Sequence, residues 1–373
     1  MARALAQRGH SVTLACGQYE GGDTGLTGAF RHGRREGVVA GFRVVEFAVP
    51  YRNGMGLAAR LWAFMHYAAR AAVLARGGWD VVVASSTPLT VVLPALLGRA
   101  PFIFEMRDPW PELPRAMGGV PAPLLWAMER LAGAACRRAA AVVALSEGMA
   151  RTARDRGAAL VHTIPNGADL DLFGPHVAPC RPAQAASHEV LAVYAGAHGR
   201  ANGLDVVLDA AALLRDVPLR LLLVGDGAEK PRLMARAAQE GLINITFLPP
   251  LPKRELAGLL AASQIGLFLL APVAAFAELT APNKLMDGLA AGLPMVGNVP
   301  GHAQRCLEDG PCGITVPPSD ASALAAALRR LALDRPLRSR LGQHARAQAV
   351  RRWDRRLQAA SFCQLVEAAA IAR

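Results

Sequence analysis

The stretch TAPNKLMDGLAAGLP, residues 280–294, decides the fold. A helix is predicted over residues 283–291, and the apolar runs at 265–270 and 295–297 on either side of it predict buried strands. A strand, a crossover helix and a second strand in this order are typical of a parallel sheet. The stretch therefore predicts an α/β fold for the second half of the chain.

The same alternation of short apolar runs and longer helical patterns extends over most of the 373 residues. Further strands are predicted at 12–15, 43–49, 81–84, 102–105, 141–145, 161–164, 190–195, 220–224, 245–248 and 314–316. Helices are predicted at 56–76, 124–138, 204–215, 229–239, 253–262 and 321–331, with a helical tail at 336–372 that breaks near Trp353.

A break divides this pattern in two. Residues 173–188 carry prolines at 175, 179 and 182 without an apolar period, which is typical of an interdomain connection. We therefore predict two Rossmann-like domains, at 1–174 and 189–352, with a linker at 175–188 and a last helix at 353–373.

The beginning of the sequence departs from a Rossmann-like half. Such a half opens with a strand, a glycine-bearing turn and a helix. Here the sequence begins within what reads as that helix, at residues 2–8, followed by Gly9-His10 and the strand at 12–15. We expect a truncated sequence that lacks the central first strand, since its loss leaves two unpaired edges; a misplaced start site and a rebuilt sheet are the alternatives.

The composition narrows the function classes. Apolar residues make up 53% of the chain and charged residues 19%, which excludes disorder. The formal charge of +12 favours phosphates or an anionic membrane as partners, although an arginine-rich composition alone also accounts for it. No nucleic-acid-recognition motif accompanies this charge, so we expect no nucleic acid. The six cysteines lack C-x-x-C spacing and predict neither a zinc site nor disulfides, as is typical of a cytosolic protein.

The helix predicted at 283–291 carries the best candidates for a phosphate site. Pro282 suits the first turn of a helix, and the N–H groups near Asn283 would attract phosphate. The helix dipole disfavours a cation there, so an anionic ligand explains Lys284 better than helix stability does. Asp287 follows one turn later on the same face and is a candidate acceptor for ribose hydroxyls. An ordinary Lys–Asp surface pair is the alternative.

Two further turns in the second half follow predicted strands. Residues 193–203, VYAGAHGRANG, place Gly196 and Gly199 where backbone can approach a ligand, with His198 and Arg200 beside them. Residues 221–227, LLLVGDG, place Gly225 at a strand end, where ligands of such sheets bind. A plain glycine-rich turn is the alternative for the first, and the second lacks the third glycine of a dinucleotide fingerprint.

In the first half, FEMRDPWPEL at residues 104–113 directly follows a predicted strand. Glu105, Arg107, Asp108 and Glu112 would gather at its carboxyl end and could orient or activate an acceptor hydroxyl. A charged loop held by internal salt bridges is the alternative. The turn IPNGAD at 164–169 contains Asn166, and its Asn-Gly pair favours a structural role.

Together these segments resemble glycosyltransferase family 4, of the GT-B architecture. The resemblance rests on Gly9-His10-Ser-Val-Thr13, Arg107-Asp108-Pro-Trp-Pro-Glu112, Ser146 with the helix after it, Ile164-Pro-Asn-Gly-Ala-Asp169 with Phe173, and Ala290-Ala-Gly-Leu-Pro294. The R-D-x-W-P-E stretch and the P-x-K helix resemble the branch that builds bacterial O-antigen, capsule or exopolysaccharide.

The resemblance implies two Rossmann-like domains facing each other across a cleft, with the last helix returning to the N-terminal domain. It implies retaining transfer, without a metal or other cofactor, from a nucleotide sugar that is bound mainly by the second domain. A UDP-linked sugar is the donor implied, and an N-acetylated amino sugar is one of the options. The acceptor implied is a polyprenyl-diphosphate-linked saccharide at the cytoplasmic face of the membrane. The site residues are then catalytic Arg107, Asp108 and Lys284; donor-binding Gly196, His198, Gly199, Arg200, Gly225, Pro282, Asn283, Lys284, Leu285 and Asp287; and acceptor-side His10, Glu105, Glu112 and Asn166.

The sequence departs from the family at two places. The glutamate pair of the donor helix falls on Leu279 and Asp287, with Glu278 beside the first, and the family's arginine and lysine of the glycine loop fall on Ala197 and Asn202. Lys284 must then supply most of the charge for the phosphates. A nucleotide-sugar epimerase and a truncated, non-catalytic relative remain the alternatives. The helices at 56–76 and 124–138 mix tryptophan, leucine and arginine, so each either lies on an anionic membrane or packs on the sheet.

Overall fold

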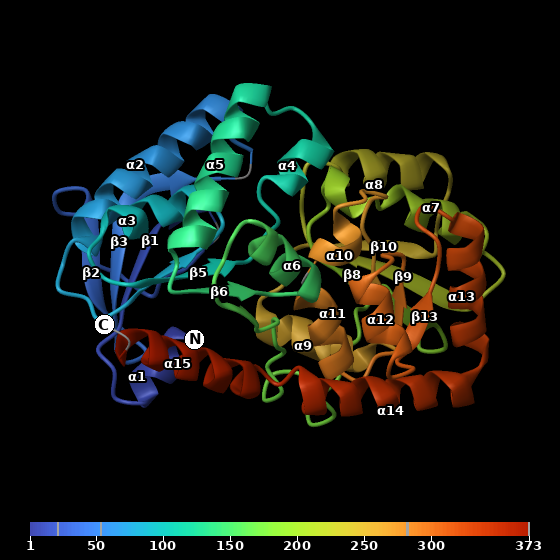
Figure 1. Ribbon diagram of the computed structural model, residues 1–373. Coiled ribbons are helices and arrows are strands. Elements are labelled where there is room, and N and C mark those ends of the chain that lie inside the picture. The colour runs from blue at the N-terminus through green and yellow to red at the C-terminus, as the bar shows by residue number, and fades with distance from the viewer. Residues whose placement is uncertain (21, 53, 281–282, 372–373) are drawn as a thin grey trace. The chain divides into compact units, whose positions relative to one another are not determined.

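The computed structural model describes residues 1–20, 22–52, 54–280 and 283–371 (Figure 1). The chain divides into two compact units, Met1–Ile164 with Ala359–Arg373, and Pro165–Gln358. Both units are built from parallel strands and crossover helices, which confirms the predicted α/β class with two Rossmann-like domains.

The Met1–Ile164 unit contains two sheets. The first has the order β1-β3-β2, in which β1 and β3 are parallel and β2 is antiparallel to β3. The second has the order β4-β5-β6-β7 and is parallel throughout. The strands are β1 (Thr13–Tyr19), β2 (Arg34–Val39), β3 (Phe42–Tyr51), β4 (Val82–Ser85), β5 (Phe102–Met106), β6 (Ala141–Ala144) and β7 (Val161–Thr163).

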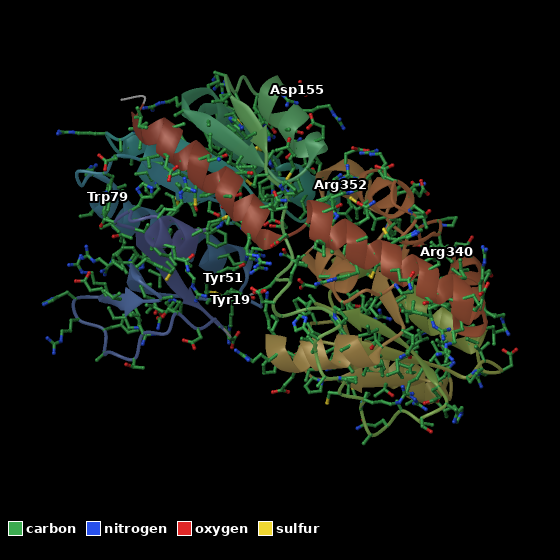
Figure 2. The ribbon with its side chains drawn as sticks, turned by 90° about the horizontal axis from the view of Figure 1, so that it is seen from below. Tyr19, Tyr51, Trp79, Asp155, Arg340 and Arg352 are labelled. Atoms are coloured by element: carbon green, nitrogen blue, oxygen red, sulfur yellow. The ribbon has the colours of Figure 1, made fainter. Side chains whose placement is uncertain are left out.

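The helices of this unit follow the predicted crossovers. They are α1 (Ala2–Gln7), α2 (Leu57–Ala75), η1 (Leu89–Val91), α3 (Val92–Leu97), α4 (Glu112–Met117), α5 (Ala122–Arg138) and α6 (Glu147–Asp155). Ser146 caps α6, because its Oγ accepts a hydrogen bond from the Met149 N–H. The end of the β1–β3 pair is marked by Tyr19 and Tyr51, whose rings stack at 5.8 Å (Figure 2).

The break between the two sheets falls between β1 and β4. Within the described residues, β1 pairs with β3 alone and β4 with β5 alone. The segments that lead into these two strands reach one apolar cluster, because Val12 and Val81 both pack against the group that contains Leu5, Ile103 and Phe362. A central strand expected from the Rossmann-like pattern would belong between these two edges.

The Pro165–Gln358 unit has one parallel sheet of order β10-β9-β8-β11-β12-β13, the doubly wound order. Its strands are β8 (Val190–Ala195), β9 (Leu219–Val224), β10 (Ile245–Leu248), β11 (Ile265–Phe268), β12 (Met295–Gly297) and β13 (Gly313–Thr315). Its helices are η2 (Arg200–Asn202), α7 (Asp205–Ala212), α8 (Lys230–Gln239), α9 (Lys253–Ala262), α10 (Phe276–Leu279), α11 (Asn283–Ala290), α12 (His302–Glu308), α13 (Ala321–Leu333) and α14 (Arg335–Arg352).

This sheet is buried on both faces. Along β8, Ala192 and Tyr194 pack with the cluster formed by α7, α8 and α13, while Leu191 and Val193 point to the opposite face and are also buried. Strands covered on both sides read as continuous apolar runs, which is why the sequence predicted them.

The division of the chain differs from the predicted boundary after residue 174. Ala168 pairs with the segment before the last helix, since its N–H donates to the Trp353 carbonyl and its carbonyl accepts from the Arg355 N–H. Residues 165–169 therefore belong with the second unit, and the turn has a structural role in which Gly167 allows the close approach of Arg355, without the left-handed backbone that the Asn-Gly pair predicted. Residues 175–188 contain neither helix nor strand, and α15 (Arg355–Ile371) belongs with the first unit from Ala359 on.

Among the helices of the described residues, none combines the length and the apolar content that crossing a bilayer requires.

Candidate functional site

Two loops at the carboxyl ends of β8 and β9 form the base of the candidate donor site. The Gly196 N–H donates to the Val224 carbonyl at 2.9 Å, and the His198 N–H donates to the Asp226 carbonyl at 2.8 Å. A Cβ at Gly225, where φ is +138°, would collide with the Gly196 carbonyl oxygen. Gly225 is thus needed so that the two loops can pack together.

Lys284 reaches this base from the first turn of α11. Its Nζ donates to the Tyr194 hydroxyl at 2.9 Å and lies 4.5 Å from the centre of that ring. A Cβ at Gly196 would lie 3.2 Å from Nζ, so the ammonium stands directly over the glycine loop. Burial lowers the pKa of Lys284 to about 8.

The Lys284 ammonium has no carboxylate partner among the described residues. The alternative of a surface Lys–Asp pair is therefore wrong, because Lys284 hydrogen-bonds to Tyr194 and not to Asp287. In the amide orientation that satisfies both of its ends, the Asn202 oxygen accepts from Lys284 Nζ at 3.1 Å and from the Tyr194 hydroxyl at 2.9 Å. A half-buried cation held only by neutral oxygens is poised for an anionic ligand.

His198 lies beneath the same loop and is fully buried. Neither of its ring nitrogens makes a hydrogen bond within the described residues. Burial, and next the charge of Lys230, lower the pKa of His198, so the ring is neutral at pH 7 and has one nitrogen that can donate. A buried imidazole without hydrogen bonds destabilises the fold unless a ligand or a water molecule supplies a partner.

Asp287 lies one turn after Lys284 and is half-buried. Its carboxylate makes no hydrogen bond within the described residues, and burial raises its pKa to about 6, partly offset by Lys253 and Arg355. A carboxylate with this pKa is mostly ionised at pH 7, so it can accept hydrogen bonds from hydroxyl groups.

The remaining donor-side candidates differ in what they offer. Gly199 precedes η2 and Arg200 is exposed, with its guanidinium 3.7 Å from the Glu229 carboxylate. Asn283 is exposed at the start of α11, whereas the Leu285 side chain is fully buried, so only its backbone can meet a ligand. Pro282 lies outside the described residues. Glu278, next to the family's glutamate position, pairs with Arg305 at 2.7 Å.

In the first unit, three of the predicted residues gather at the carboxyl ends of β4 and β5. Glu105 is buried; one carboxylate oxygen accepts from the Ser85 hydroxyl and the other lies 3.5 Å from Arg107 Nη1. Asp108 accepts from the Thr87 hydroxyl. The Arg107 guanidinium remains exposed, which leaves a cation and two carboxylates at one sheet edge.

The structure does not bring the other acceptor-side candidates to this cluster. Glu112 pairs with Arg156 at 2.6 Å, and His10 pairs with Glu367 of α15 at 2.8 Å. For Glu112 this is the internal salt bridge that the alternative interpretation of the 104–113 loop predicted, and the acceptor-side assignments of Glu112 and His10 stay predictions. Asn166 lies in the loop after β7 and within the second unit.

Several site residues escaped the sequence analysis. Ser85, Ser86 and Thr87 bind Glu105, Arg107 and Asp108 through their hydroxyls, and the signal was their run of three directly after a strand. Lys230, in place of the third fingerprint glycine, donates to the Gly225 carbonyl at 2.7 Å and adds a second cation near His198.

Two family models match the chain: the glycosyl transferase 4-like domain over residues 1–167 and glycosyl transferases group 1 over residues 189–334. The chain is 30% identical over 230 residues to WcaI of Escherichia coli K12, named as a glycosyl transferase of colanic acid biosynthesis, and the alignment covers 59% of this chain and 55% of WcaI. The chain thus spans about half the length of the curated relatives that it matches.

Solved structures share the fold. Sucrose-phosphate synthase from Thermosynechococcus elongatus superposes with a TM-score of 0.78 at 18% identity, covering 100% of this chain and 92% of that chain. HepE of Anabaena in complex with UDP-glucose superposes with a TM-score of 0.65 at 18% identity, and the match covers 86% of this chain and 91% of the HepE chain. With an N-terminal glycosyl transferase 4-like domain, a C-terminal group 1 domain and the same fold, the chain belongs to the GT-B glycosyltransferases.

Proposed function

We propose that this chain transfers a sugar from a nucleotide-sugar donor to a lipid-diphosphate-linked saccharide in the synthesis of a cell-surface polysaccharide. In this proposal transfer retains the anomeric configuration and needs no metal. The single observation that carries it is the Lys284 ammonium, which stands over the glycine loop, donates to the Tyr194 hydroxyl and has no carboxylate partner among the described residues.

The donor diphosphate would complete this site. Lys284 Nζ and the N–H groups at the start of α11 would donate to its oxygens. The leaving nucleotide gains negative charge as the sugar departs, and donors fixed in advance stabilise that charge without reorganising. Asp287 would accept from the ribose hydroxyls. UDP is the carrier favoured by the likeness to HepE, which was solved with UDP-glucose.

The acceptor would bind at the cluster of the first unit. The exposed Arg107 guanidinium suits a diphosphate, and the Glu105 and Asp108 carboxylates suit sugar hydroxyls. A polysaccharide product is favoured by the likeness to WcaI, named for colanic acid biosynthesis.

A lipid-linked acceptor requires contact with a membrane, and α2 offers a surface for it. Trp62 is 73% exposed and Val73 is 70% exposed, with Met65 on the same side of the helix. The helix carries Arg60 and Arg70 and no carboxylate. An exposed apolar stripe on a helix that carries arginines and no carboxylate favours peripheral binding to anionic lipid, at the cytoplasmic face where nucleotide sugars are supplied.

The test is a donor screen with the purified chain in excess EDTA. UDP-glucose, UDP-N-acetylglucosamine and GDP-mannose are each offered with a polyprenyl-diphosphate-linked saccharide, and products are analysed by mass spectrometry and by NMR of the new linkage. Transfer with retention in EDTA supports the proposal. Conversion of the donor without acceptor would identify an epimerase instead, and inversion or a strict need for metal would refute the stated mechanism.

A second candidate is a relative that binds the donor without transferring it. The observation that favours it is the break between β1 and β4, which lies in the acceptor-side unit. UDP would then bind in a Lys284-dependent manner although no donor is consumed.

A further inference from the structure

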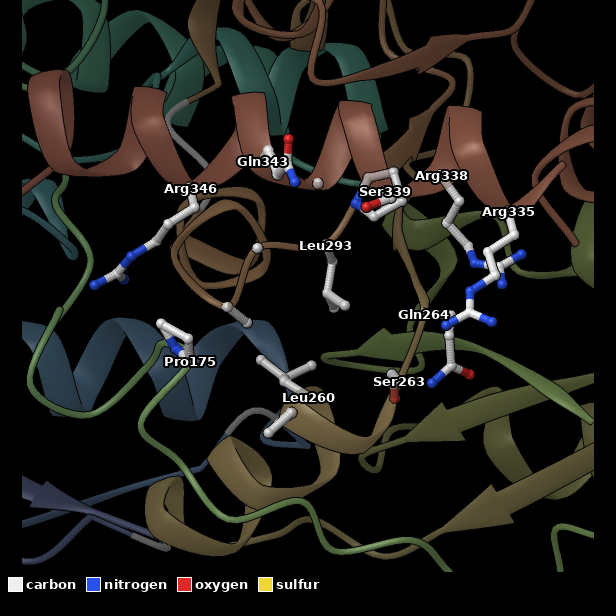
Figure 3. Close-up of a pocket in the computed structure, with 15 residues that line it drawn as sticks. Pro175, Leu260, Ser263, Gln264, Leu293, Arg335, Arg338, Ser339, Gln343 and Arg346 are labelled. Carbon is white, nitrogen blue, oxygen red and sulfur yellow. The ribbon is translucent and has the colours of Figure 1, made fainter. Parts of the chain in front are cut away.

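A groove of about 590 Å³ lies in the second unit, between the first half of α14 and the segments that lead into β11 and β12 (Figure 3). Its volume is in the range of small-molecule sites. Leu260 and Leu293 contribute an apolar floor, and Arg335, Arg338, Ser339 and Gln343 contribute a polar side.

This groove is separate from the candidate donor site. Gln264 and Pro294 line it, and they come directly before β11 and β12, at the amino ends of the strands. Gly196 and Gly225 come directly after β8 and β9, at the carboxyl ends. Because all strands of this sheet are parallel, the groove and the donor site lie at opposite ends of the strands.

The polar side of the groove is positively charged, and the neighbouring Asp334 offsets the charge on Arg338 only in part. Of its lining residues none is acidic, and Figure 3 shows Arg335 and Arg338 extending side by side toward Gln264. Arg338 Nη1 donates to the Leu331 and Ala332 carbonyls, at 2.5 and 3.0 Å, which fixes this guanidinium and leaves its Nε and Nη2 without a partner in the described chain.

Arg335 makes no hydrogen bond or ion pair within the described residues, and its charge contributes, after burial, to lowering the pKa of Arg338. Both arginines also stand in the first turn of an 18-residue helix, where the dipole disfavours cations. Two adjacent guanidiniums repel each other, and an anion that bridges them removes this repulsion.

We infer that this groove binds a small phosphorylated molecule, with the phosphate between Arg335 and Arg338 and an apolar group over Leu260 and Leu293. The guanidinium fork matches phosphate oxygens, and the two leucines match a ring or short chain. A soluble phosphate ester fits this volume; a lipid headgroup has the same chemistry and is separated from it by the experiment.

The experiment measures binding of phenyl phosphate to the full chain by calorimetry, with UDP in excess to occupy the donor site. R335Q is the main variant, because Arg335 has no partner whose loss would disturb the fold. R340Q is the matched control: Arg340 is an exposed arginine of the same helix outside the groove (Figure 2). We expect R335Q to bind roughly tenfold more weakly and R340Q to bind as the unaltered chain does.

Two further arms test the chemistry. Inorganic phosphate should bind more weakly than phenyl phosphate, because it lacks the apolar group. Equal binding by R335Q, an equal loss in R335Q and R340Q, or displacement of phenyl phosphate by UDP would overturn the inference. So would Arg335-dependent binding to vesicles of phosphatidylcholine and phosphatidic acid without binding of phenyl phosphate, since the ligand would then be a lipid surface.

Discussion

Replacing Lys284 by methionine should stabilise the protein and inactivate it at the same time. Lysine free in water has a pKa of 10.5, and burial lowers it to about 8. At about 1.4 kcal/mol per pH unit, the charged form destabilises the ligand-free fold by about 3 kcal/mol at pH 7. Methionine removes this destabilisation and keeps most of the side-chain volume. Loss of the hydrogen bond to Tyr194 destabilises the variant by about 1 kcal/mol.

The net gain of about 2 kcal/mol corresponds to a Tm increase of roughly 4–8 °C for a unit of this size. Turnover should fall about 100- to 1,000-fold, since one fixed donor to the leaving diphosphate is lost. In the unaltered chain, stability should rise as the pH increases from about 8 toward 10.5, because the unfolded chain still holds the proton that folded Lys284 has released. Lys284→Met should lack this rise.

Calorimetry without ligand and a donor-turnover assay measure both effects on one preparation. Arg340→Met is the control, because Arg340 is an exposed cation of α14 that belongs to no candidate site, and its loss should change Tm and turnover little. A Lys284→Met protein that melts below the unaltered chain, or that retains turnover within a factor of three or so of it, would refute the reasoning. UDP should also raise the Tm of the unaltered chain more than that of the variant.

Three other outcomes are expected. UDP affinity should fall as the pH drops through about 6, because protonated Asp287 no longer accepts from both ribose hydroxyls, and Asp287→Asn should remove this dependence in titrations followed by calorimetry. Gly225→Ala should lower the free energy of unfolding by roughly 3 kcal/mol through its collision with the facing loop, whereas Gly241→Ala, also at positive φ but in open space, should cost about 1 kcal/mol in denaturant titrations. Trp62→Ser should reduce cosedimentation with anionic vesicles several-fold, and Ile243→Ser, which removes an equally exposed apolar side chain from the second unit, should not; equal losses would place the membrane contact elsewhere.

The strands were predictable from the sequence wherever both faces are buried. β8 and β11 lie within the predicted ranges, because each is a continuous apolar run. β2 was missed, since it begins with Arg34-Arg35-Glu36 and its residues alternate between exposed and half-buried. Its pairing with β3 is a property of the hairpin and not of its own composition.

The site was predictable where the signal is local and not where it joins distant residues. The helix start at 283 and the loop glycines could be recognised from a few neighbouring residues in the sequence. The bond between Lys284 and Tyr194 joins residues 90 apart, and Glu112 and His10 find their arginine and glutamate partners 44 and 357 residues away. A charged side chain beside a motif therefore predicts a polar environment, while its partner depends on the tertiary fold.

The open edges of β1 and β4 bear on how the chain behaves at high concentration. Each edge presents backbone N–H and C=O groups in a row, and such rows pair readily with strands of other molecules. Leu14 of β1 and Val83 of β4 are among the exposed apolar side chains, so charge does little to block this pairing. We therefore expect concentration-dependent self-association that a short peptide of matching strand sequence suppresses, and crystals or filaments in which neighbouring molecules share a continuous sheet.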